Sequence, residues 1–351
     1  MDIHQEVQEY YGKELKESDD LKTNACCTLE PPPNFIKEAM SLVHDEVHRK
    51  YYGCGLAIPS ELAGLKVLDL GSGSGRDAYI TSKLVGESGE VVGLDMTDEQ
   101  LLVANKYVDY HTEKFSYQKP NISFIKGNID EMEETPLKND YFDLIISNCV
   151  INLCKNKEKV LRDCFNKLKS GGEFYFSDVY ASRRISAELQ ADPVLYGECL
   201  SGALYWNDFL KIAKAVGFRD ARCVSKKPIT IENDSIKEKL EGTEFYSLTY
   251  RLFKVDGLED DCEDYGQSVA YKGTISEQPT SFDLDGHHNF EKAKLEKVCG
   301  NTFLMLKNTR FEKHFDFYGT FDDHYGIFPG CGSSSPFEGV SGKNSTEGSC
   351  C

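Results

Sequence analysis

Residues 65–77, LKVLDLGSGSGRD, constrain the fold of this chain more than any other stretch. LKVLDL is a short run of mainly aliphatic residues, typical of a buried strand. GSGSG predicts a tight turn, and RDAYITSKLVG after it has the apolar spacing of a helix. Glycines let the backbone come close to a ligand, and the first turn of a helix offers unpaired N–H groups. The stretch therefore predicts the first strand, loop and helix of a nucleotide-binding domain.

The glycine pattern of the loop separates two classes of ligand. A dinucleotide-binding loop, G-x-G-x-x-G/A, ends in a small residue that lets helix and strand pack closely, but Arg76 occupies that position. Gly71, Gly73 and Gly75 instead form G-x-G-x-G, which is typical of S-adenosylmethionine (AdoMet) methyltransferases. About 20 residues on, Asp95 ends the predicted strand EVVGLDM, where a carboxylate can accept the hydroxyls of a ribose. We expect an AdoMet fold, with NAD binding or a purely structural turn as the alternatives.

The segments that follow alternate between strand and helix patterns. Strands are expected at ISFIKGNI, FDLIISN and EFYFSDVY, and helices over residues 99–115 and 157–172. This alternation predicts a parallel sheet with crossover helices, in which ligands bind at the carboxyl ends of the strands. The glycine loop, Asp95, Ile129 and Asn148 all fall at that edge.

Flanking segments have weaker patterns. A single helix is expected through IKEAMSLVHDEVHRK before the first strand, and later strands are expected at KPITIEND and EFYSLTYRLFKV. DGLEDDCEDYG is interpreted as an acidic linker, and the Gly/Ser-rich end of the chain is expected to be disordered.

Length and charge narrow the class of protein. With 351 residues, the chain is long enough for two domains, or for one domain with a substantial appendage. Its formal net charge of −18 argues against nucleic acid or an anionic membrane as partner, because both require basic faces. No apolar run approaches the ~20 residues that span a bilayer, and the polar, acidic N-terminal segment resembles neither a signal peptide nor a transit peptide. We expect a cytoplasmic protein.

Thirteen cysteines are a high count for such a protein. The odd number and the length of the chain do not fit a secreted disulfide scaffold, and the lack of a C-x-x-C pair argues against a zinc ribbon or a thioredoxin-like site. Cys164, Cys223 and Cys299 are interpreted as buried small hydrophobes. That interpretation fits less well for the cysteines in loops or among glycines: Cys26, Cys54, Cys149, Cys199 and the terminal Cys350–Cys351 pair.

Cys54, Cys149 and Cys199 form a second pattern, because each lies next to a different part of the predicted sheet. All three can converge over its carboxyl edge, where a methyl donor would lie. Three thiolates with no histidine or carboxylate in their motifs suit a soft, thiophilic centre, whereas zinc normally requires a fourth ligand or water. Trivalent arsenic needs three ligands and keeps a lone pair that can attack a sulfonium methyl. For each of these cysteines considered alone, a purely structural role is the alternative interpretation.

These motifs resemble those of the arsenite methyltransferases, the arsenic(III) S-adenosylmethionine methyltransferases. The resemblance covers roughly residues 20–255. Many methyltransferases share GSGSGRD, whereas YYGCG, SNCVINL and GECLSGALYW together are specific to this family. The resemblance implies an α/β fold: a class I AdoMet-dependent methyltransferase (Rossmann-like) domain with an arsenic-binding segment and a smaller C-terminal domain.

The implied organisation has five parts. They are an N-terminal helical segment with redox cysteines (1–64), the AdoMet-binding Rossmann-like domain (65–180), the arsenic-binding segment (181–230), a C-terminal domain (231–330) and a flexible cysteine-ended tail (331–351). The region from Lys254 on matches the family poorly, so the resemblance assigns no role to residues 256–351. The cysteines of the tail either gather arsenic or merely lie in a solvated segment.

Site residues follow from the resemblance position by position. Cys54, Cys149 and Cys199 would be the ligands of arsenic(III), and Cys26 would be a fourth, redox-active cysteine. Cys27 adjoins Cys26 and is the alternative candidate for the redox-active cysteine. The residues that would contact AdoMet are Tyr52, Gly71, Ser72, Gly73, Asp95, Met96, Ile129 and Asn148.

The resemblance also implies a reaction. Methyl groups pass from AdoMet to trivalent arsenic, free or as a thiol conjugate, and give mono- and dimethylated arsenicals. No general base is needed, because the nucleophile is a lone pair. A Cys26–Cys54 pair would be oxidised while arsenic returns to the trivalent state, and thioredoxin or glutathione would reduce the disulfide. The alternatives are an AdoMet methyltransferase of another small molecule and a non-catalytic metalloid-binding protein, which would not need GSGSG and Asp95.

Overall fold

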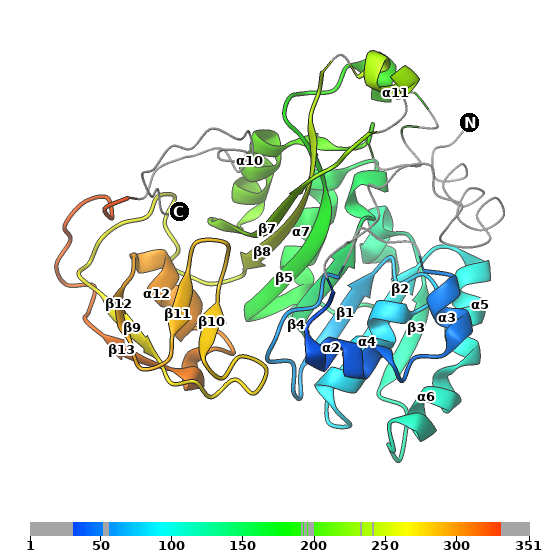
Figure 1. Ribbon diagram of the computed structural model, residues 1–351, viewed down its shortest axis with the longest axis horizontal. Coiled ribbons are helices and arrows are strands. Elements are labelled where there is room, and N and C mark those ends of the chain that lie inside the picture. Colours follow the sequence, from blue (N-terminus) through cyan, green and yellow to red (C-terminus); the bar gives the residue numbers. More distant parts are fainter. Residues whose placement is uncertain are drawn as a thin grey trace.

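The structure is a computed structural model that describes residues 31–51, 56–190, 192, 195, 200–231, 234–240 and 242–330. Within these residues, an eight-stranded sheet lies between helices, and a smaller unit lies at one end of it (Figure 1). The large sheet has the strand order β3-β2-β1-β4-β5-β8-β7, with the short β6 beside β5. Its strands are β1 (Lys66–Leu70), β2 (Glu90–Asp95), β3 (Ile122–Lys126), β4 (Phe142–Asn148), β5 (Leu168–Ala181), β6 (Leu204–Tyr205), β7 (Ala221–Pro228) and β8 (Phe245–Phe253).

The alternation of patterns correctly predicts that the first five strands are parallel. β1 pairs in parallel with β2 and β4, and β3 and β5 extend the sheet on either side. β8 runs antiparallel to β5 and β7, so residues 245–253 belong to the large sheet although the C-terminal domain was expected from residue 231. The strand predicted at KPITIEND was placed too late, since β7 has already ended at Pro228.

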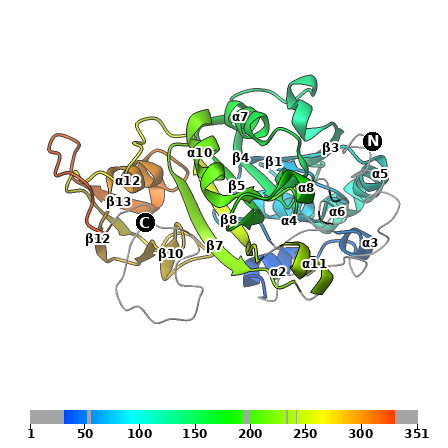
Figure 2. The same ribbon diagram turned by 90° about the horizontal axis from the view of Figure 1, so that it is seen from above.

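Helices cover both faces of the large sheet. Figure 2 shows α7 and α10 on one face and α2 and α3 beyond the other. The helices of this part are α2 (Asn34–Met40), α3 (Asp45–Arg49), α4 (Arg76–Val85), α5 (Asp98–Lys106), α6 (Val108–Lys114), α7 (Lys157–Lys167), α8 (Ala187–Gln190), α10 (Trp206–Val216) and α11 (Asp234–Lys239). None of the described helices is long and apolar enough to cross a membrane.

Three predicted helices have different bounds in the structure. IKEAMSLVHDEVHRK forms α2 and α3, because His44 caps α3 by accepting the Glu46 N–H at Nδ1, over 3.1 Å. Imidazole is not among the usual N-cap groups, so the sequence did not signal this break. The helix expected over residues 99–115 breaks at Tyr107 into α5 and α6. α7 ends at Lys167, and the glycines expected to close it lie in β5 instead.

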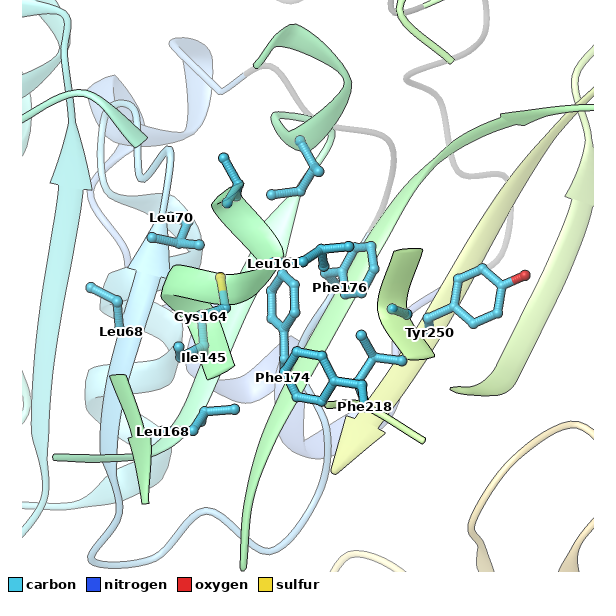
Figure 3. Packing of buried hydrophobic residues seen from close by; sticks show 14 of the residues in the cluster. Leu68, Leu70, Ile145, Leu161, Cys164, Leu168, Phe174, Phe176, Phe218 and Tyr250 are labelled. Carbon is cyan, nitrogen blue, oxygen red and sulfur yellow. The ribbon is translucent and has the colours of Figure 1, made fainter. Parts of the chain in front are cut away.

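Alternating residues of the strands divide the core between the two faces. Leu68 and Leu70 of β1 pack towards α7 and α10, whereas Val67 packs towards α2 and α4. In the first cluster the rings of Phe174 and Phe176 are stacked, with centroids 4.3 Å apart (Figure 3). Cys164 of α7 is completely buried in the same cluster, which confirms that it is a core residue.

The smaller C-terminal unit has its own core. Its elements are β9 (Ser268–Tyr271), β10 (Ser281–Asp283), β11 (Asn289–Glu291), β12 (Leu295–Lys297), α12 (Gly300–Lys307) and β13 (Phe315–Tyr318). β12, β9 and β13 form one sheet, and β10 and β11 form a hairpin. The acidic stretch expected to be a linker packs against α12: Leu258 is buried, and the Glu259 N–H donates to Asn301 Oδ1 over 2.8 Å.

Buried ion pairs join the C-terminal unit to the large sheet. Glu173 of β5 is fully buried and pairs with Arg251 of β8, at 2.6 Å, and with Arg310 of the C-terminal unit. Arg222 of β7 pairs with Asp285, at 3.3 Å. Each buried charge thus has an opposite charge beside it, which offsets the cost of removing it from water.

Candidate active site

A cleft of about 930 Å³, counting the space at its mouth, opens at the carboxyl ends of β1, β2 and β4. β1 and β4 are neighbours, and the helices that follow them, α4 and α7, pack on opposite faces of the sheet. This is the switch point at which open α/β sheets bind ligands. The predicted residues that line the cleft are Gly71, Ser72, Gly73, Asp95, Met96, Ile129, Asn148 and Cys149.

The glycine loop has a backbone that other residues would strain. Gly71 has φ of 68°, and a Cβ there would lie 2.4 Å from the side chain of Val150. Gly75 has φ of 91° and is the N-cap of α4, and a Cβ there would lie 2.8 Å from the ring of Phe124. Only glycine tolerates both a positive φ and a position with no space for a Cβ. The loop can therefore turn tightly from β1 into α4, and its backbone faces the cleft.

Asp95 connects the glycine loop to the end of β2. Its Oδ2 accepts the Gly73 N–H and its Oδ1 accepts the Thr97 N–H, each over 2.8 Å. Burial raises the pKa of this carboxyl, and the two backbone N–H groups oppose that shift. A carboxylate has about four acceptor positions, so Asp95 can accept ligand hydroxyls as well.

Asp69 of β1 is a second acidic residue of the cleft, which the sequence analysis did not select. It is 3% exposed, and its Oδ2 has no hydrogen-bond partner among the described residues. Burial, together with the nearby carboxylates of Asp77 and Asp95, raises the pKa of Asp69 well above its ordinary value. A cationic ligand would relieve this arrangement. An acidic residue inside the apolar run LKVLDL was the signal that could have identified it.

A network of polar side chains closes the cleft on the side of α4. Asn148 Nδ2 donates to Asp77 Oδ2 over 3.1 Å, and Tyr51 Oη donates to the same oxygen over 3.3 Å. Arg76 pairs with Asp77 at 2.7 Å and stacks on the Tyr51 ring, 3.1 Å from its centroid. Asn148 was among the residues predicted from the sequence, whereas Tyr51 and Asp77, which also line the cleft, were not. The predicted Tyr52 lies outside the described residues.

Ile129 lies on a short 3₁₀ turn, Ile129–Glu134, at the edge of the cleft. The next residue, Asp130, accepts the N–H groups of Lys155 and Asn156, each over 2.9 Å. These bonds tie the turn to the start of α7, so Asp130 positions the wall of the cleft, and Ile129 with Met96 makes that wall apolar.

Cys149 directly follows β4 and lines the cleft. It has φ of 57°, which is uncommon for a residue other than glycine, and its N–H donates to Ser177 O over 2.9 Å. A non-glycine residue keeps this conformation only where the surrounding structure holds it there. Cys149 is 4% exposed and disulfide-bonded. The other predicted cysteines, Cys26, Cys54 and Cys199, lie outside the described residues.

Comparisons with known proteins show the family of this chain. A family model described as a methyltransferase domain matches residues 61–217, and one described as an arsenite methyltransferase C-terminal domain matches residues 265–351. An arsenite methyltransferase from Aquipseudomonas alcaligenes is 54% identical over 336 residues, which are 96% of this chain and 96% of that protein. This chain belongs to the arsenite methyltransferase family. The mouse arsenite methyltransferase is 44% identical over 90% of this chain and 84% of its own length.

A solved structure supports the same assignment. The crystal structure of an arsenic(III) S-adenosylmethionine methyltransferase from Chlamydomonas reinhardtii matches with a TM-score of 0.83 and 47% identity. The match covers 85% of this chain and all of that one. The family resemblance and the AdoMet methyltransferase fold predicted from the sequence are therefore confirmed. The matched C-terminal model also extends the family likeness beyond residue 255, where the sequence motifs were weak.

Proposed function

We propose that this arsenite methyltransferase transfers methyl groups from AdoMet to trivalent arsenic bound by the thiolates of Cys54, Cys149 and Cys199. The products are mono- and dimethylated arsenicals. The observation that carries the proposal is the position of Cys149, which lines the cleft beside Asn148 on strained backbone.

The residues of the cleft fit AdoMet. Asp95 would accept the ribose hydroxyls, and the glycine loop lets the backbone approach the ligand without a Cβ in the way. Asp69, which is buried and whose Oδ2 has no hydrogen-bond partner among the described residues, would face the positive charge of the ligand. Ile129 and Met96 would pack against its base. When bound there, AdoMet supplies an electrophilic methyl group on a cationic sulfur.

On the arsenic side, the cysteines act as thiolates, so metalloid binding releases protons and is pH-dependent. The attacking lone pair belongs to arsenic, and the reaction needs no general base. The disulfide of Cys149 would have to be reduced before this residue could bind arsenic, which supports a thiol reductant, thioredoxin or glutathione, as partner.

Turnover also needs a redox partner within the chain. We assign this role to a Cys26–Cys54 pair, with Cys27 as the alternative to Cys26. Methyl transfer formally oxidises arsenic by two electrons, and formation of one disulfide returns two electrons and restores the trivalent state. A reducing compartment suits this chemistry, so we place the enzyme in the cytoplasm.

The ligand set is tested by serine variants of the cysteines. Purified variants are incubated with arsenite, AdoMet and thiol, and the arsenic species are separated by chromatography. Cys149→Ser and Cys199→Ser should abolish methylation of every arsenical while calorimetry shows unchanged AdoMet binding. Cys164→Ser, in the core, should keep activity. A Cys199→Ser variant that still methylates trivalent monomethylarsenic would show that the three-thiolate site is wrong.

The redox role is tested with two substrates. Monomethylated trivalent arsenic has two positions left for thiolates, so it should need Cys149 and Cys199 but neither Cys54 nor Cys26. Cys26→Ser and Cys54→Ser should therefore lose activity on arsenite and retain it on trivalent monomethylarsenic. Equal loss on both substrates would argue against a relay. Loss of arsenite activity in Cys27→Ser, with retention in Cys26→Ser, would assign the role to the neighbour.

A further inference from the structure

Cys262 and Cys299 form a pair of thiols outside the active site, between the large sheet and the C-terminal unit. Both are thiols that take part in no disulfide, and their side chains hydrogen-bond to each other. Cys299 is the N-cap of α12, where its Sγ accepts the Thr302 N–H over 3.4 Å. The same sulfur lies 3.9 Å from Arg222 Nη2 of β7. This is a defined polar site, in contrast to the inert core role that the sequence suggested for Cys299.

The backbone holds the two thiols together. The Gly300 N–H, next to Cys299, donates to Glu263 O over 2.9 Å, next to Cys262. The Cys262 carbonyl accepts the Phe328 N–H over 2.8 Å. Because these bonds fix both chain segments, little conformational entropy remains to be lost when one ligand bridges the two sulfurs.

The surroundings favour one thiolate in the pair. The hydrogen bond from Cys262 lowers the pKa of Cys299, and the charge of Arg222 and the bonds from Thr302 act in the same direction. The bond to Cys299 and burial raise the pKa of Cys262. Arg222 is held in place by Asp220, at 2.7 Å, and by Asp285. The pair therefore offers a thiolate beside a proton-bearing thiol, and both sulfurs become ligands when that proton leaves.

The number of thiols restricts the ligand. No group of three or more His, Cys, Asp or Glu side chains that could hold a metal ion occurs in the described part of the chain, so the described side chains do not form a four-coordinate zinc site. Two soft thiolates suit a thiophilic centre with two exchangeable positions. Cys299 is 1% exposed, while Cys262 is only partly buried, so a ligand can reach the pair from the side of Cys262.

We propose that Cys262 and Cys299 bind a monomethylated trivalent arsenical as a second thiol site, separate from the active site. In this exchange two As–O bonds of CH₃As(OH)₂ break and two As–S bonds form. The proton of the Cys262 thiol leaves with one hydroxyl as water, and the Cys299 thiolate displaces the second hydroxyl, which takes a proton from the solvent and also leaves as water. Arsenic stays trivalent, and no oxidant or reductant is needed. The choice of ligand depends on the proposed methylation of arsenic, because that reaction produces this species.

The test uses the full-length reduced chain and phenylarsine oxide, a monosubstituted trivalent arsenical. After treatment with the probe, Cys262 is labelled with N-ethylmaleimide and quantified by peptide mass spectrometry. The probe should reduce labelling of Cys262 at least tenfold, and 2,3-dimercaptopropanol should restore it. In Cys299→Ser the protection should be lost, because one thiol cannot chelate. Serine is a favoured N-cap, so this substitution keeps the cap of α12.

Control variants separate this site from the active site. Cys223→Ser removes a nearby cysteine of β7 whose Sγ contacts Ser225 O, and it should keep the protection of Cys262. Cys149→Ser should also keep it while losing methylation. If wild-type enzyme does not methylate arsenic and Cys262 is still protected, the proposed activity fails but the dithiol site stands.

Stoichiometry gives an independent readout. Native mass spectrometry should count one phenylarsenic group fewer per chain in Cys262→Ser and in Cys299→Ser than in the wild type. The proposal is overturned if the count is unchanged in both variants, or if Cys299→Ser protects Cys262 as well as the wild type does. It is also overturned if the reduced pair binds no probe and only forms a disulfide on oxidation, which would make it a redox pair.

Discussion

The cleft that we propose binds AdoMet and the junction with the C-terminal unit both bury acidic side chains, but these side chains have different partners. At the junction, Glu173 is fully buried between Arg251 and Arg310. In the cleft, Asp69 is 3% exposed, and its Oδ2 has no hydrogen-bond partner among the described residues. Burial raises its pKa, and the neighbouring carboxylates of Asp77 and Asp95 raise it further. A buried acid with partners holds two parts of the structure together. A buried acid among like charges is costly by itself, and we propose that a cationic ligand binds beside it.

The largest effect on stability is expected when a buried acid that is paired with arginines is removed. Glu173→Ala leaves two buried arginines without their partner, and the free energy of unfolding in urea should fall by about 3–5 kcal/mol. AdoMet affinity should change little at temperatures where the variant is folded. The matched control is Glu158→Ala, which breaks an exposed pair with Arg162 on α7 and should cost less than about 0.5 kcal/mol. Equal effects of the two variants would contradict the structural role of the junction.

The next effect concerns ligand binding. Asp95→Ala removes the carboxylate that holds the glycine loop and that would accept the ribose hydroxyls. Each charge-assisted hydrogen bond that is lost costs about 1.5–3 kcal/mol, so AdoMet affinity should fall at least tenfold in calorimetry. An unchanged affinity would remove Asp95 from the site.

The smallest expected effect is an increase in the stability of the protein. Asp69→Asn should stabilise the ligand-free protein by about 0.5–2 kcal/mol, as expected when a strained functional residue is replaced, and should weaken AdoMet binding. The pKa of Asp69 is raised in the folded protein. The contribution of Asp69 to the free energy of unfolding is therefore fully present below its pKa in the unfolded chain, and it is lost as the pH rises through its pKa in the folded protein. The stability gain of the variant should therefore grow with pH. A destabilised variant at high pH would show that Asp69 has a partner in the folded protein.

The geometry of the glycine loop could be predicted from the sequence because its causes are local. Strand β1, the turn and α4 follow one another in the chain, and the positive φ of Gly71 and Gly75 is something only glycine adopts readily. Asp95 could be predicted for a similar reason, since it ends the next strand of a parallel sheet. Cys149 was placed at the same edge because it follows β4.

The residues that were missed depend on contacts between distant segments. Asp77 looks like an ordinary first-turn residue of α4, and only its bonds with Tyr51 and Asn148 bring it into the cleft wall. KPITIEND resembled a strand, but the pairing partner β8 aligns with residues 221–228 instead.

The sequence alone determined the family, the AdoMet fold and the carboxyl edge where the site lies, because repeating apolar patterns and glycine loops act over a few residues. Tertiary structure alone decided what each buried ionisable group does. Cys299 has the sequence context of a core cysteine, and its lowered pKa arises from Cys262 and Arg222, which belong to other elements. Asp69 and Glu173 are both acids within strands, yet Glu173 forms ion pairs with two arginines, whereas Asp69 has two carboxylates among its neighbours. Electrostatic energies depend on distances through space, and the fold sets those distances.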